Sequence, residues 1–258
     1  MIAGMGWGVM AAAMALLWAV QRRYGKAGIV DIVWAAGVGV LGVLFAAFGS
    51  GYPPRRLLIG LLAGGWSLRL TSYLLVRVVT MPEDGRYEAM KQKWGERTQA
   101  YLFWFFQIQA LWSMMFALPM LLAANNATKP LSSLDAAGAG VFAVAVFGET
   151  LADRQLAAFR ARRANKGKVC NTGLWRYSRH PNYFFEWLHW WAYVLIGWQA
   201  PYGWATLAGP AVMLFFLLKV TGIPPTEENA LRSRGEAYRE YQRTTSVFFP
   251  LPPKKEPA

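Results

Sequence analysis

The chain has 258 residues, of which 55% are hydrophobic and only 16% are charged. Soluble domains usually carry about a quarter charged residues, so this composition excludes an ordinary soluble domain. The formal net charge of +13 would suggest nucleic-acid binding in a soluble protein. Here the basic residues lie between apolar runs, as the positive-inside rule describes for membrane loops, and we expect no nucleic-acid partner.

Apolar stretches of spanning length recur along the chain, at residues 2–20, 28–49, 57–80, 101–124, 134–158, 183–199 and 202–219. A membrane-spanning helix needs about 20 apolar residues. The last two stretches are short and are joined by a tight turn with Pro201 and Gly203. We therefore predict an all-α polytopic membrane protein with seven transmembrane helices. Because Arg22 and Arg23 follow the first stretch, we interpret it as a span and not as a secretory signal.

Basic residues are concentrated in alternate loops, which predicts the orientation. They follow the first, third, fifth and seventh stretches, whereas the turn between the sixth and seventh has no charge. These loops should lie in the cytosol, with the N-terminus outside and the C-terminus inside. Arg55 and Arg56 are exceptions on the outer side. The localisation that follows is a cell membrane.

The segment after Lys219 has a different character. It opens with two prolines, and Thr226 is positioned to cap a helix whose first turn contains Glu227 and Glu228. We expect a cytosolic helix that lies against the membrane helices. Residues 251–258 read as a tail.

Polar residues form one stripe on each of three predicted membrane helices. The three stripes are Arg69, Tyr73 and Arg77; Glu149, Asp153 and Arg160; and Arg179, Asn182, Glu186, His189 and Tyr193. Charged groups at membrane depth usually face a cavity or one another. Snorkelling ends and structural pairs are the alternative explanation. A ligand with many donors and acceptors would satisfy the stripes, and arginines with carboxylates suit a nucleotide.

Other features are less specific. Asp31 is the only acid of the second stretch, and either a solvated helix end or a buried functional group fits its position. Trp187, Trp190, Trp191 and Trp198 fit an interfacial belt and packing better than a ligand box. Cys170 is the single cysteine, so no internal disulfide forms, and no Cys/His spacing predicts a metal site.

Several stretches carry a family resemblance. "GLWRYSRHPNYFFEWLHWWAYV", "EENALRSRGEAYREYQRTTSVFFP" and "LADRQLAAFR" resemble the C-terminal domain of the steroid 5-alpha-reductase family, in particular its bacterial branch, and "SLRLTSYLLVR" matches more loosely. The resemblance implies a seven-helix membrane enzyme that binds NADPH and transfers a hydride to the β carbon of a conjugated enone, as in 3-oxo-Δ4 steroids. It further implies a lipophilic substrate pocket in residues 1–130, NADPH binding in residues 131–250 and, through the bacterial branch, a location in a bacterial inner membrane.

The resemblance also assigns roles to individual residues. Asp153 and Arg160 would bind the adenosine end of the cofactor, and Asn182 and Glu186 the nicotinamide end. The remaining residues assigned to the cofactor are Arg69, Tyr73, Lys168, Arg179, His180, Tyr183 and Tyr241. In the family an acid of the second span and a tyrosine early in the third polarise the substrate carbonyl. Here Asp31 and Trp66 occupy those places, and Phe185 replaces a family glycine.

Other activities compete with this one. An "RHPxY" turn with a later "EE…Y…Y" tail also occurs in membrane methyltransferases of the isoprenylcysteine carboxyl type, which bind S-adenosylmethionine. That cofactor has no phosphates, and the arginine-rich exit of the fifth stretch favours a phosphorylated one. Sterol C14 reductases would share NADPH but not the substrate. A non-enzymatic membrane scaffold would leave the polar stripes unexplained. The expected partners are a lipophilic enone and membrane lipid.

Overall fold

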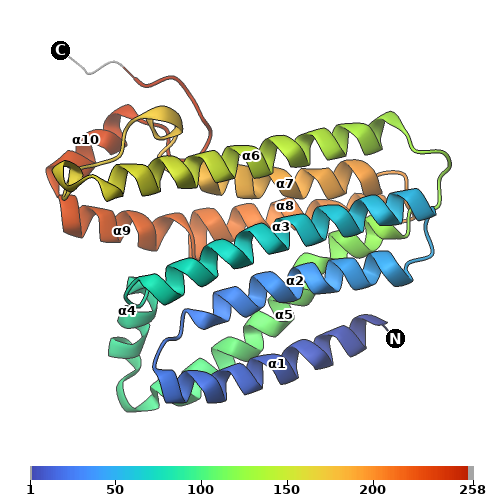
Figure 1. Ribbon diagram of the computed structural model, residues 1–258, viewed down its shortest axis with the longest axis horizontal. Helices are drawn as coiled ribbons and strands as arrows, with labels where there is room; N and C mark the ends of the chain where they lie inside the picture. Colours follow the sequence, from blue (N-terminus) through green and yellow to red (C-terminus); the bar gives the residue numbers. More distant parts are fainter. Residues whose placement is uncertain (1, 255–258) are drawn as a thin grey trace. The chain divides into compact units, whose positions relative to one another are not determined.

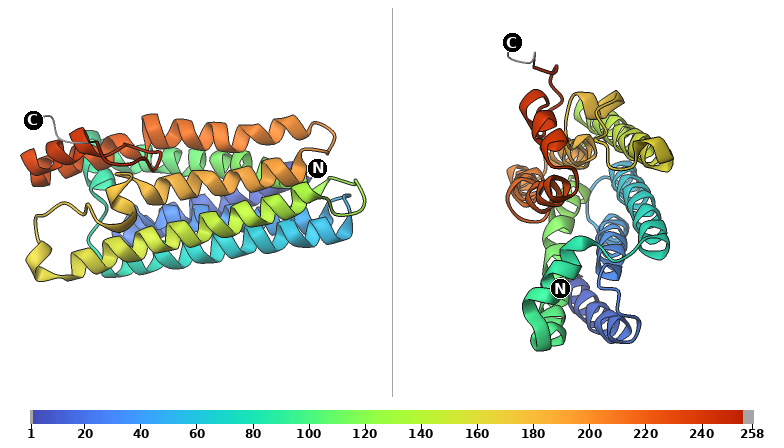
Figure 2. Two further views of the ribbon diagram at one scale, coloured as in Figure 1. Left: turned by 90° about the horizontal axis from the view of Figure 1, so that it is seen from above. Right: turned by 90° about the vertical axis from the view of Figure 1, so that its left-hand side faces the viewer.

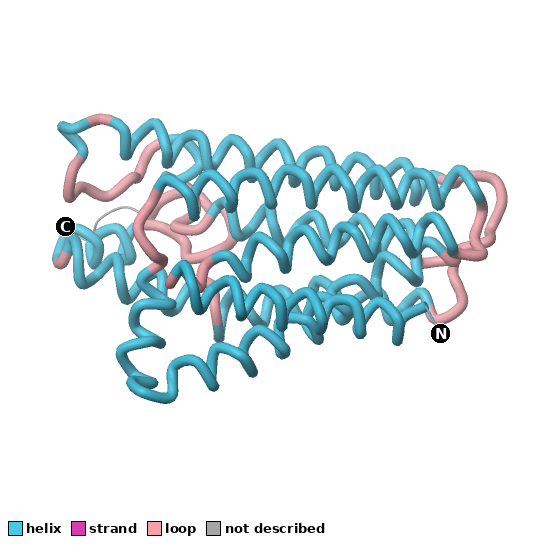
Figure 3. Tube along the Cα trace, turned by 60° about the horizontal axis from the view of Figure 1, so that its bottom comes forward, coloured by secondary structure: helices cyan, strands magenta, loops and turns pink. Residues whose placement is uncertain are grey.

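The computed structural model describes residues 2–254, which form helices joined by loops and turns, without a β-strand among them (Figure 3). Figure 1 labels the α-helices: α1 (Ile2–Tyr24), α2 (Ile29–Phe48), α3 (Pro53–Thr80), α4 (Gly85–Trp94), α5 (Thr98–Ala124), α6 (Ser133–Ala161), α7 (Pro181–Gly197), α8 (Ala208–Phe215), α9 (Ile223–Arg234) and α10 (Glu236–Thr244). A π-helical turn, Phe216–Val220, follows α8. The predicted all-α class is confirmed.

Six of the described helical segments are long and apolar enough to cross a membrane. They are Gly4–Tyr24, Ile29–Phe48, Pro53–Thr80, Gly85–Ala124, Ser133–Ala161 and Gly203–Arg234. The protein is therefore a multi-pass membrane protein. Helix α7, which corresponds to the predicted sixth span, has 17 residues and is not among the six. Its role as a seventh span stays a prediction.

The chain forms two compact units, which are described separately. Unit 1 contains the residues up to Asp135 together with Tyr193–Gly209. Unit 2 contains Ala136–Ala192 and the residues from Pro210 onward. The chain passes from one unit to the other within α6, α7 and α8.

In unit 1, α2 and α3 run antiparallel in close contact. The Ser67 hydroxyl of α3 donates to the carbonyl of Ala35 on α2 over 3.0 Å. A Cβ added at Gly39 would lie 2.0 Å from the Cβ of Ser67. Small residues at the contact let the two backbones approach, as is common between membrane helices.

Arg55 and Arg56, the exceptions to the charge pattern, both have intramolecular partners. Arg55 is fully buried and binds Asp135 through two nitrogens, at 2.6 and 2.7 Å. It also donates to the carbonyls of Asn126 and Thr128. Arg56 donates to the carbonyls of Ala46 and Ala47 at the end of α2. Neither guanidinium is a free loop charge.

In unit 2, α6 and α7 lie side by side and run antiparallel (Figures 1 and 2). The indole of Trp175, just before α7, donates to the carbonyl of Ala152 on α6 over 2.9 Å. This pairing brings Asp153 of the α6 stripe within 3.3 Å of Asn182 of the α7 stripe.

The segment after Lys219 differs from its prediction in two respects. Helix α9 begins at Ile223, before Thr226, because prolines suit the first turn of a helix. The Thr226 hydroxyl donates to the carbonyl of Gly222 over 2.7 Å, so Thr226 is not the N-terminal cap. The segment is also divided into two helices at Gly235, which has a φ of 55°.

Candidate functional site

Asp31 lies in the first turn of α2 and contacts the short helix α4. Its carboxylate accepts a 2.7 Å hydrogen bond from the Tyr87 hydroxyl and pairs with Arg86 at 3.2 Å. Both contacts use Asp31 as an acceptor. The sequence interpretation missed Tyr87 and Arg86 because α4 is polar and was assigned to a loop.

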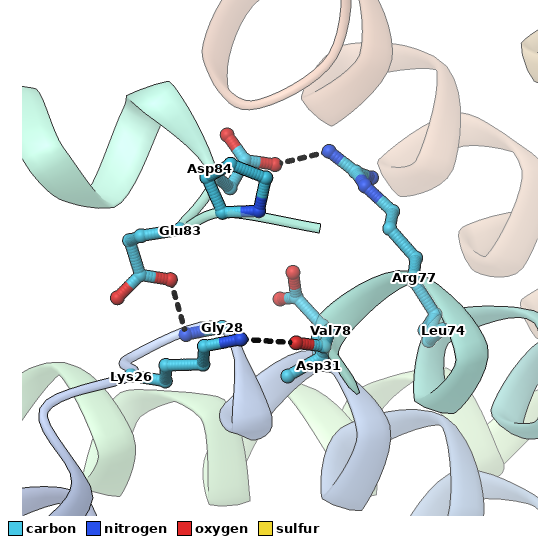
Figure 4. Close-up of a pocket in the computed structure, with 9 residues that line it drawn as sticks. Lys26, Gly28, Asp31, Leu74, Arg77, Val78, Glu83 and Asp84 are labelled. Carbon is cyan, nitrogen blue, oxygen red and sulfur yellow. Dashed lines mark hydrogen bonds and ion pairs between the residues drawn. The ribbon is translucent and has the colours of Figure 1, made fainter. Parts of the chain in front are cut away.

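Two sets of hydrogen bonds, one made by Glu83 and one by Lys26, hold the loops around Asp31 (Figure 4). Glu83 accepts from the backbone N–H groups of Ala27 and Gly28, at 2.6 and 3.1 Å. Lys26 donates to the carbonyl of Val78 over 2.7 Å, near the end of α3. Lys26, Gly28, Val78 and Glu83 border a small cavity together with Asp31.

The charge on Glu83 follows from the same contacts. Burial raises the pKa of Glu83, but the hydrogen bonds from Lys91, Ala27 and Gly28 lower it by more. The net pKa lies below its ordinary value, so Glu83 is ionised at neutral pH and stabilises this corner of unit 1.

The other predicted residues of unit 1 are on α3. Trp66 is fully buried, and its ring meets that of Trp34 edge to face with centroids 6.3 Å apart. The Arg69 guanidinium lies 5.5 Å from the centre of the Tyr73 ring, one helical turn away. Arg69 and Tyr73 are thus brought together.

In unit 2, a buried polar cluster lies between α6 and α7. The Asn182 amide donates to Asp153 over 3.3 Å. Glu149, Asp153 and Glu186 are all at most 9% exposed, so three carboxyl groups are buried on two adjacent helices. His189 is 1% exposed, and its Nδ1 lies 2.5 Å from the Glu186 carbonyl oxygen. Such a cluster offers hydrogen-bond acceptors to a ligand rich in hydroxyl and amide groups.

A turn of exposed cations follows α6. Its members are Arg162, Arg163, Lys166 and Lys168, and none of them has an ion-pair partner among residues 2–254. The turn is ordered by the Asn165 amide, which donates to the carbonyl of Phe159 over 2.9 Å. Arg160 is exposed on the last turn of α6.

The exposed arginines of α9 and α10 differ from these cations. Arg232 pairs with Glu228, and Arg239 and Arg243 both pair with Glu236. The turn after α6 is therefore a place where unit 2 presents uncompensated positive charge.

Arg179 and His180 are held by an acid that the sequence interpretation did not assign to the site. Glu227 of α9 binds Arg179 at 2.6 Å and the His180 ring at 3.3 Å. It also accepts from the Gln242 side chain over 2.9 Å. Arg179 further donates to the carbonyl of Thr245 over 2.6 Å. The "PPTEEN" start of α9 was the available signal for Glu227.

The two predicted tyrosines of unit 2, Tyr183 and Tyr241, support the same turn. The Tyr241 hydroxyl donates to the carbonyls of Trp175 and Ser178. The Tyr183 ring stacks on His180 with centroids 5.3 Å apart. Arg179, His180, Tyr183 and Tyr241 thus share intramolecular contacts that fix the start of α7 next to the buried carboxylates.

The cysteine and the histidine near this turn are both shielded. Burial raises the pKa of the Cys170 thiol, which favours the neutral, unreactive form. Burial lowers the pKa of His180, and the opposing effect of Glu227 is smaller. Among the described residues no group of three or more His, Cys, Asp or Glu side chains is placed to hold a metal ion.

Comparison with known proteins gives one match. A family model described as "Protein of unknown function (DUF1295)" matches residues 17–245, which is most of the chain. No curated protein and no solved structure matches the chain.

Proposed function

Because the chain belongs to the DUF1295 family, whose function is unknown, we propose its activity from its own polar groups: an NADPH-dependent membrane reductase that acts on a lipophilic conjugated enone. The single observation that carries the proposal is the composition of unit 2. It combines buried carboxylates on α6 and α7 with an uncompensated cationic turn at the end of α6. A ligand that matches both has phosphates and also hydroxyl or amide donors.

The residues of unit 2 fit this cofactor by their chemistry. Lys168 and the other cations of the turn would bind phosphates, together with Arg160 of the last turn of α6. Asp153 would accept from ribose hydroxyls, and Glu186 from the carboxamide, with Asn182 beside it. When bound, NADPH supplies a hydride to the β carbon of the enone and leaves as NADP⁺, while the α carbon takes a proton from solvent.

The task of the chain is to orient and to exclude water. Glu227 holds Arg179 and His180, which fixes the start of the helix that carries Asn182 and Glu186. Asp31 and Trp66, on α2 and α3 of unit 1, are assigned to the substrate. Arg69 and Tyr73, also in unit 1, are assigned to the cofactor.

The finer topology belongs to the same proposal. Helix α7 is a seventh span, the N-terminus is outside and the C-terminus is cytosolic, in a bacterial inner membrane. The Arg55–Asp135 ion pair supports this orientation, because it neutralises one of the two positive charges that conflicted with it. Arg56 keeps its charge and is held by backbone carbonyls of α2.

The activity is tested with purified protein, NADPH and a panel of 3-oxo-Δ4 steroids and simpler lipophilic enones. We expect NADPH consumption that depends on the enone, and a product whose C=C bond is reduced while its ketone is kept. Glu186→Gln should lower turnover or NADPH affinity at least about tenfold, since it removes a charged acceptor. Glu228→Gln, which changes an exposed acid of α9, is the matched control. Consumption of S-adenosylmethionine instead of NADPH would identify a methyltransferase and would reject the reductase.

A further inference from the structure

The last described segment of the chain, residues 246–254, is fixed to the turn before α7. The Arg179 N–H donates to the Ser246 carbonyl over 2.8 Å, and the Leu251 N–H donates to the Tyr177 carbonyl over 3.0 Å. All of these residues belong to unit 2. We call residues 246–254 the C-terminal strap.

Two phenylalanines attach the strap to α7. Phe248 is buried, its carbonyl accepts from the Ser178 hydroxyl over 2.8 Å, and its ring lies 5.7 Å from that of Trp187. The Phe249 ring lies 5.8 Å from the Trp187 ring and 6.0 Å from the Phe184 ring. The strap therefore extends the aromatic surface of the first two turns of α7.

The outer face of the strap is apolar. Phe249 is 51% exposed and Leu251 is 54% exposed, and Val247 and Tyr177 are exposed as well. Helix α10, which directly precedes the strap, exposes mainly charged side chains instead. A group of large exposed apolar side chains on an ordered segment indicates a surface that contacts lipid or protein.

The backbone of the strap favours lipid as the contact. Three of its residues, Pro250, Pro252 and Pro253, have no N–H group. The N–H groups of Leu251 and Lys254 both donate to carbonyl oxygens of the protein. From residue 250 to residue 254 every backbone N–H is thus absent or bonded. Irregular backbone next to lipid requires this, because lipid offers no acceptors, whereas a segment in water does not.

The length of α7 places the strap at the membrane surface. Its 17 residues give about 26 Å, whereas the hydrocarbon core is about 30 Å thick. The apolar side chains of the strap lie at the start of α7 and lengthen its apolar surface at that end. Arg176 and Lys254, both exposed, lie next to this apolar face along the chain and suit headgroup phosphates.

We propose that the strap is a membrane-interface anchor. Val247, Phe249 and Leu251 enter the boundary between headgroups and acyl chains and hold the start of α7 at that depth. The partner of the apolar face is the bilayer and not a second copy of the chain. The depth rests on α7 as the proposed seventh span, and the reductase activity is not required for it.

The test measures spin-label accessibility in the full chain, reconstituted in phosphatidylcholine vesicles. The native thiol is removed by Cys170→Ala, and a nitroxide is attached to the new thiol of Phe249→Cys or, in a separate protein, of Leu251→Cys. Ala237→Cys, at an exposed position of α10, is the matched control. Collisions are measured with oxygen, which concentrates in lipid, and with a nickel chelate that stays in water. Two strap positions are used so that a local disturbance at one does not decide the result.

We expect the ratio of oxygen to nickel accessibility in Phe249→Cys and Leu251→Cys to exceed that in Ala237→Cys several-fold. Equal ratios in the three proteins would place the strap in water and would overturn the proposal. Protection from both reagents, with dipolar broadening that disappears on dilution with unlabelled protein, would show that a second copy covers the face and would also overturn it. NADPH is absent from the measurement, so the reductase proposal can fail while the anchor stands, and the reverse.

Discussion

The Phe185 ring of α7 lies directly over Gly148 of α6. A Cβ added at Gly148 would be 2.4 Å from the ring, and the contacts that it would meet are three atoms of that ring. Phe185 occupies the place for which the family resemblance implies a glycine, and the glycine that lets the two helices approach is Gly148 on α6. Compared with that expectation, the large and the small residue of the α6–α7 contact are exchanged.

This exchange predicts a double-mutant cycle. Gly148→Ala should lower the free energy of unfolding by about 1–3 kcal/mol, because it overpacks the contact with Phe185. Phe185→Ala should also destabilise, by about 3–5 kcal/mol, since it leaves a cavity. In the double variant the new methyl group fills part of that cavity, so the loss should be smaller than the sum. The losses are compared through the thermal midpoints of the parent, the two single variants and the double variant in one detergent. Additive losses would contradict the contact.

The buried Arg55–Asp135 pair should be a principal contributor to the stability of unit 1. Arg55→Met leaves an unpaired carboxylate and frees the carbonyls that Arg55 binds, so we expect a loss of about 3–5 kcal/mol. Arg55→Lys keeps the charge but loses the two-nitrogen geometry. Its free energy of unfolding should therefore lie between those of the parent protein and Arg55→Met. Arg56→Met, at the neighbouring position, is the control and should cost clearly less. Chemical unfolding in mixed micelles gives the comparison, and equal effects at the two positions would be inconsistent with this role.

His180 predicts a pH dependence with a defined sign. Burial lowers its pKa in the folded protein below the ordinary value of about 6.5, which the unfolded chain retains. The unfolded state therefore binds the proton first as the pH falls, and stability present above about pH 6.5 is lost below it. The thermal midpoint should fall between pH 7.5 and 5.5. His180→Gln should reduce this dependence of the thermal midpoint on pH. An unchanged dependence in that variant would show that other groups cause it.

The apolar runs predicted the long helices because burial in lipid requires about 20 apolar residues, and this signal is local. Helix α4 was missed because it is short and polar, and with it the partners of Asp31. Glu227 was missed as the partner of Arg179 because 48 residues separate them along the chain. The stripes predicted that Asp153 and Asn182 face a common region, since helical periodicity alone sets their faces. The fit of Phe185 against Gly148 depends on the relative placement of two helices, which no local pattern contains.

The most direct test of the central claim is cofactor binding by the detergent-purified full chain, with NADPH and S-adenosylmethionine compared by thermal midpoint. A ligand that binds only the folded state raises the midpoint by mass action. The account predicts a rise with NADPH that is reduced in Arg162→Ala/Arg163→Ala/Lys166→Ala, and no rise with S-adenosylmethionine. A rise with S-adenosylmethionine alone would contradict it.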